Sequence, residues 1–220
     1  EKPKQATRKS SQNTLEVLTK ALPELIGGSA DLSGSVLTKT SQTQSITKSD
    51  FSGRYIHYGI REHAMGAIMN GLALHGEFIP YAGTFLVFSD YMKPAIRLAA
   101  LMKLRVIYIF THDSIGLGED GPTHQPIEHL ATLRAIPNVN VFRPADAQET
   151  IGCFEQALKS KETPSAMILT RQSVDFLRNE YIKDAGFCGR GGYIISDTAL
   201  EIEPDVVLIA SGSEVTIANE

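Results

Sequence analysis

The feature that most limits how this chain can fold is a repeated alternation between short apolar runs and longer amphipathic stretches. Strand-like runs are expected at residues 55–58, 78–81, 105–110, 138–142 and 166–170. Stretches with helical spacing are expected between them, at residues 61–75, 89–103, 126–136 and 146–159. Strands that alternate with helices form parallel sheets, because each helix carries the chain back along the sheet. The sequence therefore predicts an α/β fold with a mainly parallel sheet and helices on both faces.

Capping and loop signals indicate where some of these elements begin. An opening helix is expected from Asn13, where leucines recur at helical spacing and Glu16 completes a capping box. Residues 33–49 are rich in Ser and Thr and lack a hydrophobic period, which indicates a long loop. Asp146, with Glu149 three residues later, predicts a cap for the helix that ends at Lys159.

The regular pattern stops near residue 171. Glycines gather at residues 186–192, which is typical of a linker, and the apolar run at residues 206–210 predicts a buried strand. We therefore expect two units, residues 1–180 and residues 181–220, the second being the start of a truncated α/β unit. Because there is no initiating Met and the chain stops within an expected helix, we expect a fragment of a longer protein.

Composition and charge exclude several classes of function. The 21 Lys and Arg residues are outnumbered by 25 Asp and Glu, which gives a net charge of −4 and no basic stripe, so no nucleic-acid partner is expected. No apolar run approaches the roughly 18 residues of a membrane span, so no membrane partner is expected. Cys153 and Cys188 belong to no metal-type pattern, which suits a reducing compartment and a cytoplasmic location. Small-molecule chemistry is the remaining expectation.

The loops that follow the expected strands are the candidate sites, because ligands of parallel α/β sheets bind at the carboxyl ends of strands. The loop at residues 111–125 follows the most apolar strand and holds five ionisable side chains. They are His112, Asp113, Glu119, Asp120 and His124. From the residues alone, an active site and an ordinary polar surface loop are equally good interpretations.

This loop approaches two familiar motifs without completing either. Residues 116–121 match GxGxxG, yet a dinucleotide-binding loop needs its first Gly at the strand end and its last Gly within a helix, and neither is expected here. His124, Glu128 and His129 miss the spacing of the zinc motifs HExxH and HxxEH. Neither a dinucleotide site nor a metal site is therefore expected.

Other candidates have both a functional and a structural interpretation. Glu62 falls in the first turn of a helix, where the helix dipole favours a carboxylate, and this alone explains its position. Phe85, Phe88 and Tyr91 follow helical spacing and could either fill a core or wall a pocket for an aromatic ring. No local signal distinguishes Arg8, Ser35 and Arg171 from solvated surface residues.

Four motifs taken together make this sequence resemble the transketolase family. They span residues 27–32, 59–63, 83–85 and 111–126, and the last reads THDSIGLGEDGPTHQP. The resemblance covers residues 1 to about 180 as the family's pyrimidine-binding domain, a fold of the thiamine-diphosphate-binding Pyr type, and the remainder as the start of its C-terminal domain. The N-terminal domain that holds the diphosphate and Mg²⁺ in that family is expected to lie outside this chain.

The resemblance implies an activity, a cofactor and an assembly. Transketolases transfer a two-carbon ketol (glycolaldehyde) unit from a ketose phosphate to an aldose phosphate with thiamine diphosphate, in the pentose phosphate pathway. Their active site forms at the interface of a homodimer, so this chain alone is expected to be inactive. Its expected partners are sugar phosphates and a second subunit.

The resemblance also implies roles for individual residues. Glu62 corresponds to the family glutamate that exchanges a proton with the aminopyrimidine, and His124 to a histidine that contacts the cofactor and the oxygen on the reacting carbon. Asp120 corresponds to a residue that binds a substrate hydroxyl. The aromatic wall of the aminopyrimidine comprises Phe85, Phe88 and Tyr91, with Phe88 as the closest stacking partner. The substrate-phosphate cluster comprises Arg8, Ser35, His112 and Arg171.

Three alternatives to a transketolase stay open. Dihydroxyacetone synthase shares most of these motifs. Deoxyxylulose-phosphate synthase has a related domain, but its glycine-rich loop lacks the context of Pro122, Gln125 and Pro126 found here. The third is a non-catalytic dimerisation module, since the small residues at positions 64–73 suit packing as well as cofactor binding.

Overall fold

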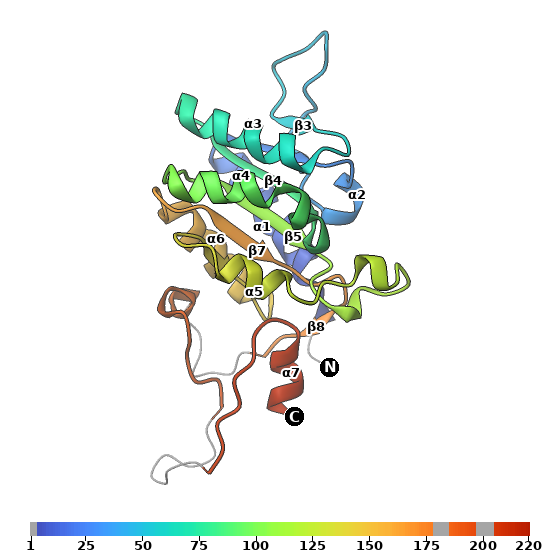
Figure 1. Cartoon of the computed structure of the whole chain (residues 1–220), viewed down its shortest axis with the longest axis vertical. Coiled ribbons are helices and arrows are strands. Elements are labelled where there is room, and N and C mark those ends of the chain that lie inside the picture. Colours follow the sequence, from blue (N-terminus) through green and yellow to red (C-terminus); the bar gives the residue numbers. More distant parts are fainter. Residues whose placement is uncertain (1–3, 178–184, 197–204) are drawn as a thin grey trace.

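The computed structural model describes residues 4–177, 185–196 and 205–220. Its strands are β1 (Lys4–Gln5), β2 (Leu25–Ser29), β3 (Tyr55–His57), β4 (Ile79–Phe85), β5 (Ile107–Thr111), β6 (Asn140–Phe142), β7 (Ser165–Ile168) and β8 (Val174–Asp175). Its α-helices are α1 (Thr7–Ala21), α2 (Ser33–Val36), α3 (Glu62–His75), α4 (Ser89–Leu101), α5 (His129–Arg134), α6 (Ala147–Lys159) and α7 (Glu214–Asn219). Six parallel strands form one sheet in the order β3-β2-β4-β5-β7-β6, and β1 pairs antiparallel with β8 (Figure 1).

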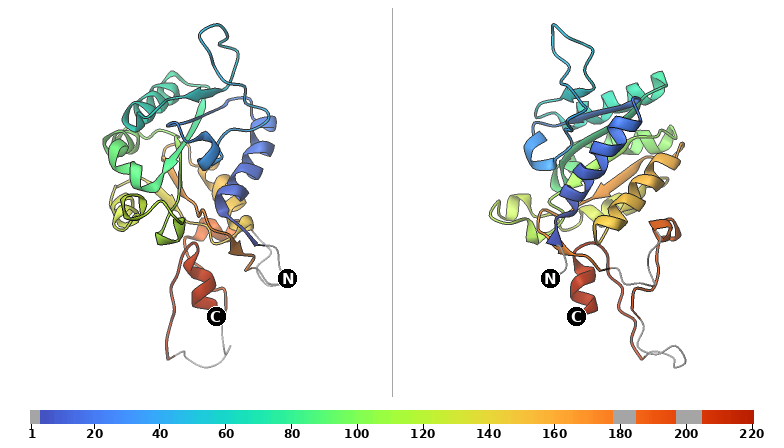
Figure 2. Two further views of the ribbon diagram at one scale, coloured as in Figure 1. Left: turned by 90° about the vertical axis from the view of Figure 1, so that its right-hand side faces the viewer. Right: turned by 180° about the vertical axis from the view of Figure 1, so that it is seen from behind.

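The sheet separates two layers of helices. Helices α3, α4 and α5 cover one face, and α1 and α6 cover the other (Figure 2). Alternate residues of β5 serve the two faces: Tyr108 and Phe110 pack under α3 and α4, whereas Ile107 and Ile109 pack under α1 and α6. Because all five residues of β5 are buried, this strand is apolar almost throughout. The predicted α/β fold, with a mainly parallel sheet and helices on both faces, is confirmed.

The first helix begins earlier than predicted. Helix α1 starts at Thr7, and Asn13 lies within it instead of capping it, so the predicted capping box at Asn13 is wrong. The residue before the helix, Ala6, provides no side-chain cap. Instead, the amide of Thr7 donates to the hydroxyl of Thr170, which is 163 residues away in the sequence. No local pattern reveals such a partner.

The start of α5 differs from the prediction, whereas the start of α6 agrees with it. Helix α5 begins at His129, three residues after the predicted start at Pro126. Helix α6 begins as predicted, since Oδ1 of Asp146 accepts a hydrogen bond from the amide of Glu149 at 2.9 Å. Within the described residues, no helix combines the length and the apolar character needed to cross a membrane.

The C-terminal segment differs from the prediction of a second buried strand. Residues 206–210 form no strand among the described residues. Residues 206–209 are 70% to 92% exposed. An apolar run becomes a strand only where a neighbouring strand completes its hydrogen bonds, and the described residues provide none. The predicted boundary between residues 180 and 181 lies outside the described residues.

The carboxyl ends of the parallel strands face one edge of the sheet, on the right in Figure 1. The segments that follow β2, β4, β5 and β7 meet at this edge. They carry most of the residues that the sequence analysis singled out.

Candidate active site

Four aromatic side chains meet at the carboxyl ends of β4 and β5. Phe85 ends β4, and its ring stacks on that of His112 with the ring centroids 3.7 Å apart. Phe88 lies almost parallel to Phe85, at a centroid distance of 5.7 Å and an interplanar angle of 8°. His124 meets Phe88 and Phe85 edge-on, at centroid distances of 5.4 and 6.1 Å. We call these four residues the aromatic group.

Glu62, at the first position of α3, contacts the end of β4, the strand that ends with Phe85 of the aromatic group. The residue is 7% exposed, and its Oε1 accepts a hydrogen bond from the hydroxyl of Thr84 at 3.5 Å. Because Thr84 directly precedes Phe85, the carboxylate and the aromatic group share the end of β4. A buried carboxylate at the strand end that carries stacked rings suits a flat ring with nitrogen at its edge.

Arg8 and Arg171 lie near each other although they are far apart in the sequence. Burial and the charge of Arg171 lower the pKa of Arg8. The guanidinium of Arg8 donates a hydrogen bond to the backbone oxygen of Ser35 at 2.6 Å. Among the described residues, no carboxylate lies within ion-pair distance of either arginine. Two neighbouring guanidiniums that no carboxylate neutralises favour an anion, and their planar donor sets suit phosphate.

His112 adds a neutral group to these arginines. The residue is 3% exposed, its backbone is left-handed with φ 58°, and its Nδ1 lies 2.8 Å from the hydroxyl of Thr111. Burial, together with the charges of Arg8 and Arg171, lowers the pKa of His112 to about 4 despite the opposing charge of Asp120. The imidazole is therefore uncharged near neutral pH and offers hydrogen bonding in place of positive charge.

The loop after β5 is shaped around Arg171. Gly118 has φ 107°, a conformation that residues with a Cβ disfavour, and a Cβ built there lies 2.9 Å from Nη1 of Arg171. Glycine at this position therefore lets Arg171 lie against the loop. Further along the loop, Asp120 is exposed and His124 is half-buried. The charges of both act on His112, which places them in the same neighbourhood.

The predicted site residues thus fall into two neighbouring sets joined by His112. One set is the aromatic group with Glu62, and the other surrounds the two arginines. Tyr91 is the outlier, since it is 65% exposed and contacts the aromatic group through Phe88, with the ring centroids 6.1 Å apart. Ser35 takes part through the backbone oxygen that binds Arg8.

The sequence analysis missed the ion pair that supports the loop. The buried carboxylate of Asp113, next to His112, accepts hydrogen bonds on Oδ2 from Nε and Nη2 of Arg143, at 3.0 and 2.9 Å. Burial raises the pKa of Asp113, whereas Arg143 lowers it. Arg143 also binds Ser211 and Glu214, so it joins this loop to the segment around α7. No periodic or capping signal connects residues 30 positions apart.

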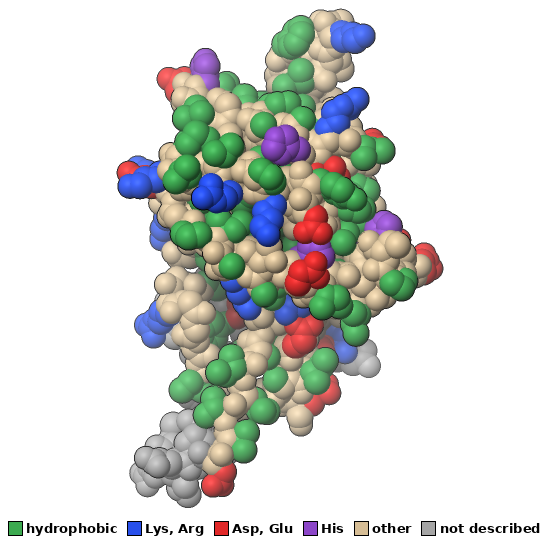
Figure 3. All heavy atoms as spheres, viewed as in Figure 1, with side chains coloured by type: hydrophobic (Ala, Val, Ile, Leu, Met, Phe, Trp, Pro, Cys, Tyr) green, Lys and Arg blue, Asp and Glu red, His purple; other side chains and the backbone are tan. Residues whose placement is uncertain are grey.

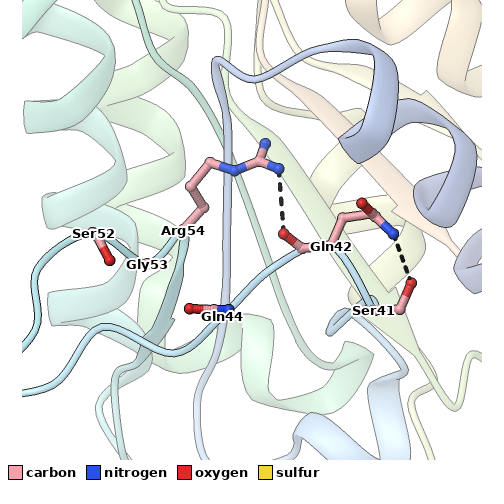
Figure 4. Close-up of a pocket in the computed structure, with 6 residues that line it drawn as sticks. All are labelled: Ser41, Gln42, Gln44, Ser52, Gly53 and Arg54. Carbon is pink, nitrogen blue, oxygen red and sulfur yellow. Dashed lines mark hydrogen bonds between the residues drawn. The ribbon is translucent and has the colours of Figure 1, made fainter.

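Two other polar sites lie outside this arrangement. Asp90, Glu128 and His129 bring possible metal ligands within 4.8 Å of one another. The two carboxylates approach opposite ring nitrogens of His129: Oδ2 of Asp90 is hydrogen-bonded to Nε2 at 3.0 Å, whereas Oε2 of Glu128 lies 3.9 Å from Nδ1. A polar pocket lies near the amino ends of β2 and β3 (Figure 4). The guanidinium of Arg54, which lines it, donates to backbone oxygens of Thr19 and Leu22 at the end of α1. These bonds give Arg54 a structural role away from the candidate site.

Comparisons with known proteins agree on one family. The family described as "Transketolase, pyrimidine binding domain" matches residues 3–175. A transketolase from Sinorhizobium medicae is 59% identical over 215 residues, which are 98% of this chain and 30% of that protein. A Pichia stipitis transketolase in complex with sedoheptulose 7-phosphate is 47% identical, with a TM-score of 0.92 over 99% of this chain and 32% of that one. The chain spans about a third of the length of the curated relatives it matches.

A more distant solved structure is shorter than these. It is a split-gene transketolase described as an inactive β4 tetramer, and it is 30% identical with a TM-score of 0.62. The match covers 81% of this chain and 55% of that one.

Proposed function

Because the chain belongs to the transketolase family through its pyrimidine-binding domain, we propose that it forms the part of a transketolase subunit that binds the aminopyrimidine of thiamine diphosphate. The whole enzyme transfers a two-carbon ketol unit from a ketose phosphate to an aldose phosphate, in the pentose phosphate pathway. In this proposal residues 1–180 are the pyrimidine-binding domain and residues 181–220 begin the C-terminal domain. The family match over residues 3–175 supports the first assignment.

The observation that carries the proposal is the buried carboxylate of Glu62 at the end of β4, where the aromatic group also lies. Thiamine diphosphate, when bound, supplies the carbanion-stabilising chemistry that ketol transfer requires. Glu62 holds a proton at a carboxyl oxygen for exchange with the ring nitrogen, and its burial strengthens that hydrogen bond. Phe88 would be the closest stacking partner of the ring, and Phe85 and Tyr91 would complete the aromatic wall that excludes water. His124 would contact the cofactor and the oxygen on the reacting carbon.

The second set of residues binds the substrate. Arg8 and Arg171 bind the sugar phosphate as two guanidiniums. Neutral His112 adds a hydrogen bond from Nε2 in the tautomer in which its Nδ1 accepts from the hydroxyl of Thr111. Ser35 holds Arg8 in place. Asp120 binds a substrate hydroxyl nearer the reacting carbon. The Pichia stipitis relative in complex with sedoheptulose 7-phosphate supports a sugar phosphate as the ligand class.

The complete enzyme needs groups that this chain does not carry. Mg²⁺ and the diphosphate are held by another part of the protein, and the active site forms in a homodimer. The outer surfaces of α3 and α4 support a partner subunit, since apolar side chains lie among charged ones on that face (Figure 3). These exposed apolar residues are Ile68, Leu74, Tyr91, Leu98 and Leu101. A cytoplasmic location is part of the proposal, because the two cysteines of the sequence belong to no disulfide framework or metal-type pattern, which suits a reducing compartment.

The proposal is tested with Glu62→Gln in the complete subunit. We expect ketol transfer from xylulose 5-phosphate to ribose 5-phosphate to fall by about 10²- to 10⁴-fold, because the amide cannot exchange the proton. Glu162→Gln, at an exposed position in the turn before β7, is the matched control and is expected to keep its activity. An unimpaired Glu62→Gln enzyme excludes the role proposed for this carboxylate.

The isolated chain provides the second test. We expect it to show no ketol transfer, and we expect transfer to appear when the missing domains are supplied. The split-gene relative described as an inactive tetramer supports this expectation. Isothermal titration calorimetry of the complete protein with thiamine diphosphate distinguishes an enzyme from a dimerisation module. A dimerisation module is expected to bind no thiamine diphosphate.

A further inference from the structure

The two arginines of the proposed phosphate site occur in matching sequence contexts. The first lies in Thr7-Arg8-Lys9-Ser10 and the second in Thr170-Arg171-Gln172-Ser173. In each case a threonine directly precedes the arginine. The two threonines meet in the interior, where Thr7 is 0% and Thr170 is 1% exposed.

The two threonines form a closed set of hydrogen bonds. The amide of Thr7 donates to Oγ1 of Thr170 at 3.0 Å, and the amide of Thr170 donates to Oγ1 of Thr7 at 2.7 Å. The two hydroxyl oxygens lie 3.1 Å apart, so one hydroxyl donates to the other. The amide of Arg8 adds a bond to the backbone oxygen of Thr170 at 3.3 Å. We call Thr7 and Thr170 the threonine clamp.

The threonine clamp replaces a local helix cap. The first amides of a helix lack partners within it, and usually the preceding side chain accepts from them. Ala6 precedes α1 and cannot do so. Thr170 accepts from the amides of Thr7 and Arg8 instead, so the first turn of α1 is held to the segment that directly follows β7. A serine at position 6 would cap the helix without joining it to β7, so capping alone does not require this arrangement.

The consequence concerns the separation of the two arginines. Arg8 and Arg171 each follow a clamp residue directly, so their backbones have little freedom to move apart. Their like charges repel, and the charge of Arg171 contributes to lowering the pKa of Arg8. A phosphate dianion is bound best by donors that are already held in place, because ordering them on binding costs free energy.

We propose that Thr7 and Thr170 are positioning residues for phosphate recognition, setting the spacing of the Arg8 and Arg171 guanidiniums through their paired hydroxyls. This inference rests on the proposed function, in which these arginines bind the substrate phosphate. The threonines act through the arginines and do not contact the substrate.

The test is Thr170→Val in the complete enzyme, with ribose 5-phosphate and ribose as acceptors and an unphosphorylated ketol donor at saturation. The two acceptors differ only in the phosphate. We expect KM for ribose 5-phosphate to rise about tenfold with kcat nearly unchanged, and KM for ribose to stay the same. The inhibition constant of inorganic phosphate is expected to rise by the same factor. Thr170→Ser keeps the hydroxyl and is expected to restore both values.

Thr19→Val is the matched control. Thr19 is another buried threonine of α1, about 16 Å along the helix from Arg8. Its hydroxyl pairs with that of Thr40 at 2.9 Å. The Thr19→Val variant is expected to be less stable but to keep the same ratio of KM for ribose 5-phosphate to KM for ribose. Thr7→Val removes the other clamp hydroxyl and keeps the test valid if Thr170→Val does not fold, because it is expected to produce the same selective loss.

The outcomes separate this inference from the function on which it rests. Suppose that Arg171→Gln raises KM for ribose 5-phosphate but not for ribose, whereas Thr170→Val and Thr7→Val behave like Thr19→Val. The positioning role of the threonines is then excluded, and the phosphate site stands. If Arg171→Gln affects both acceptors equally, the phosphate site itself is wrong. A selective loss in the valine variants that serine restores supports the threonine clamp.

Discussion

Replacing Gly118 by alanine tests how closely the loop after β5 is fitted to Arg171. Gly118 has φ 107° and ψ −138°, and Gly121 has φ 81° and ψ −173°. Both conformations are disfavoured for residues with a Cβ, at a cost of about 1–3 kcal/mol each. The surroundings differ, because a Cβ at Gly118 lies 2.9 Å from Nη1 of Arg171, whereas a Cβ at Gly121 meets no atom within 4 Å. Gly121→Ala is therefore a control for backbone strain.

The two variants are expected to agree in stability and to differ in phosphate binding. Each should lower the free energy of unfolding by about 1–3 kcal/mol, measured by chemical denaturation. Only Gly118→Ala should also displace the guanidinium of Arg171, because the end of this flexible side chain moves more easily than the loop backbone. Loss of a charged hydrogen bond is worth about 1.5–3 kcal/mol, which corresponds to about 10- to 150-fold in binding.

The assay is inhibition of the complete enzyme by inorganic phosphate, with KM for ribose 5-phosphate measured in parallel. We expect both constants to rise at least about tenfold in Gly118→Ala and to change by less than about twofold in Gly121→Ala. Equal constants in the two variants would refute the view that this glycine makes room for Arg171.

Two further predictions concern ionisable side chains that are buried near the candidate site. The folded pKa of His112 is about 4, below the ordinary value of 6.5, so the unfolded chain binds its proton first. The stability that His112 contributes is complete above about pH 6.5 and is lost as the pH falls toward 4. Asparagine tolerates the left-handed backbone, so His112→Asn should lose less unfolding free energy than the parent between pH 7 and 5, measured in urea titrations. Equal losses in the two proteins would contradict this. Arg143→Met should lower the unfolding free energy by about 3–5 kcal/mol, because it leaves the buried carboxylate of Asp113 without its partner. Adding Asp113→Asn should recover part of that loss, and an undiminished stability in Arg143→Met would show that the pair matters little.

Two features that depend on neighbours in the sequence were predicted correctly. The strand at β5 and the helix at α6 follow from a run of apolar residues and from a cap whose two partners are three positions apart. The position of the candidate site could be predicted for a related reason, since the carboxyl ends of parallel strands must lie at one edge of the sheet. Two features predicted wrongly depend on partners elsewhere. The amide of Thr7 at the start of α1 binds Thr170, and residues 206–210 form no strand because no described neighbour pairs with them.

The sequence by itself determined the α/β class of this protein and the loop that carries much of its candidate site, because hydrophobic period and turn chemistry act over a few residues. Only the tertiary structure decided that Arg8, His112 and Arg171 share one neighbourhood and that His112 there is uncharged. It also decided that Tyr91 stays largely exposed while Phe85 is buried against His112. Burial and electric field at a side chain are sums over all atoms around it, and most of those atoms come from segments far away in the sequence.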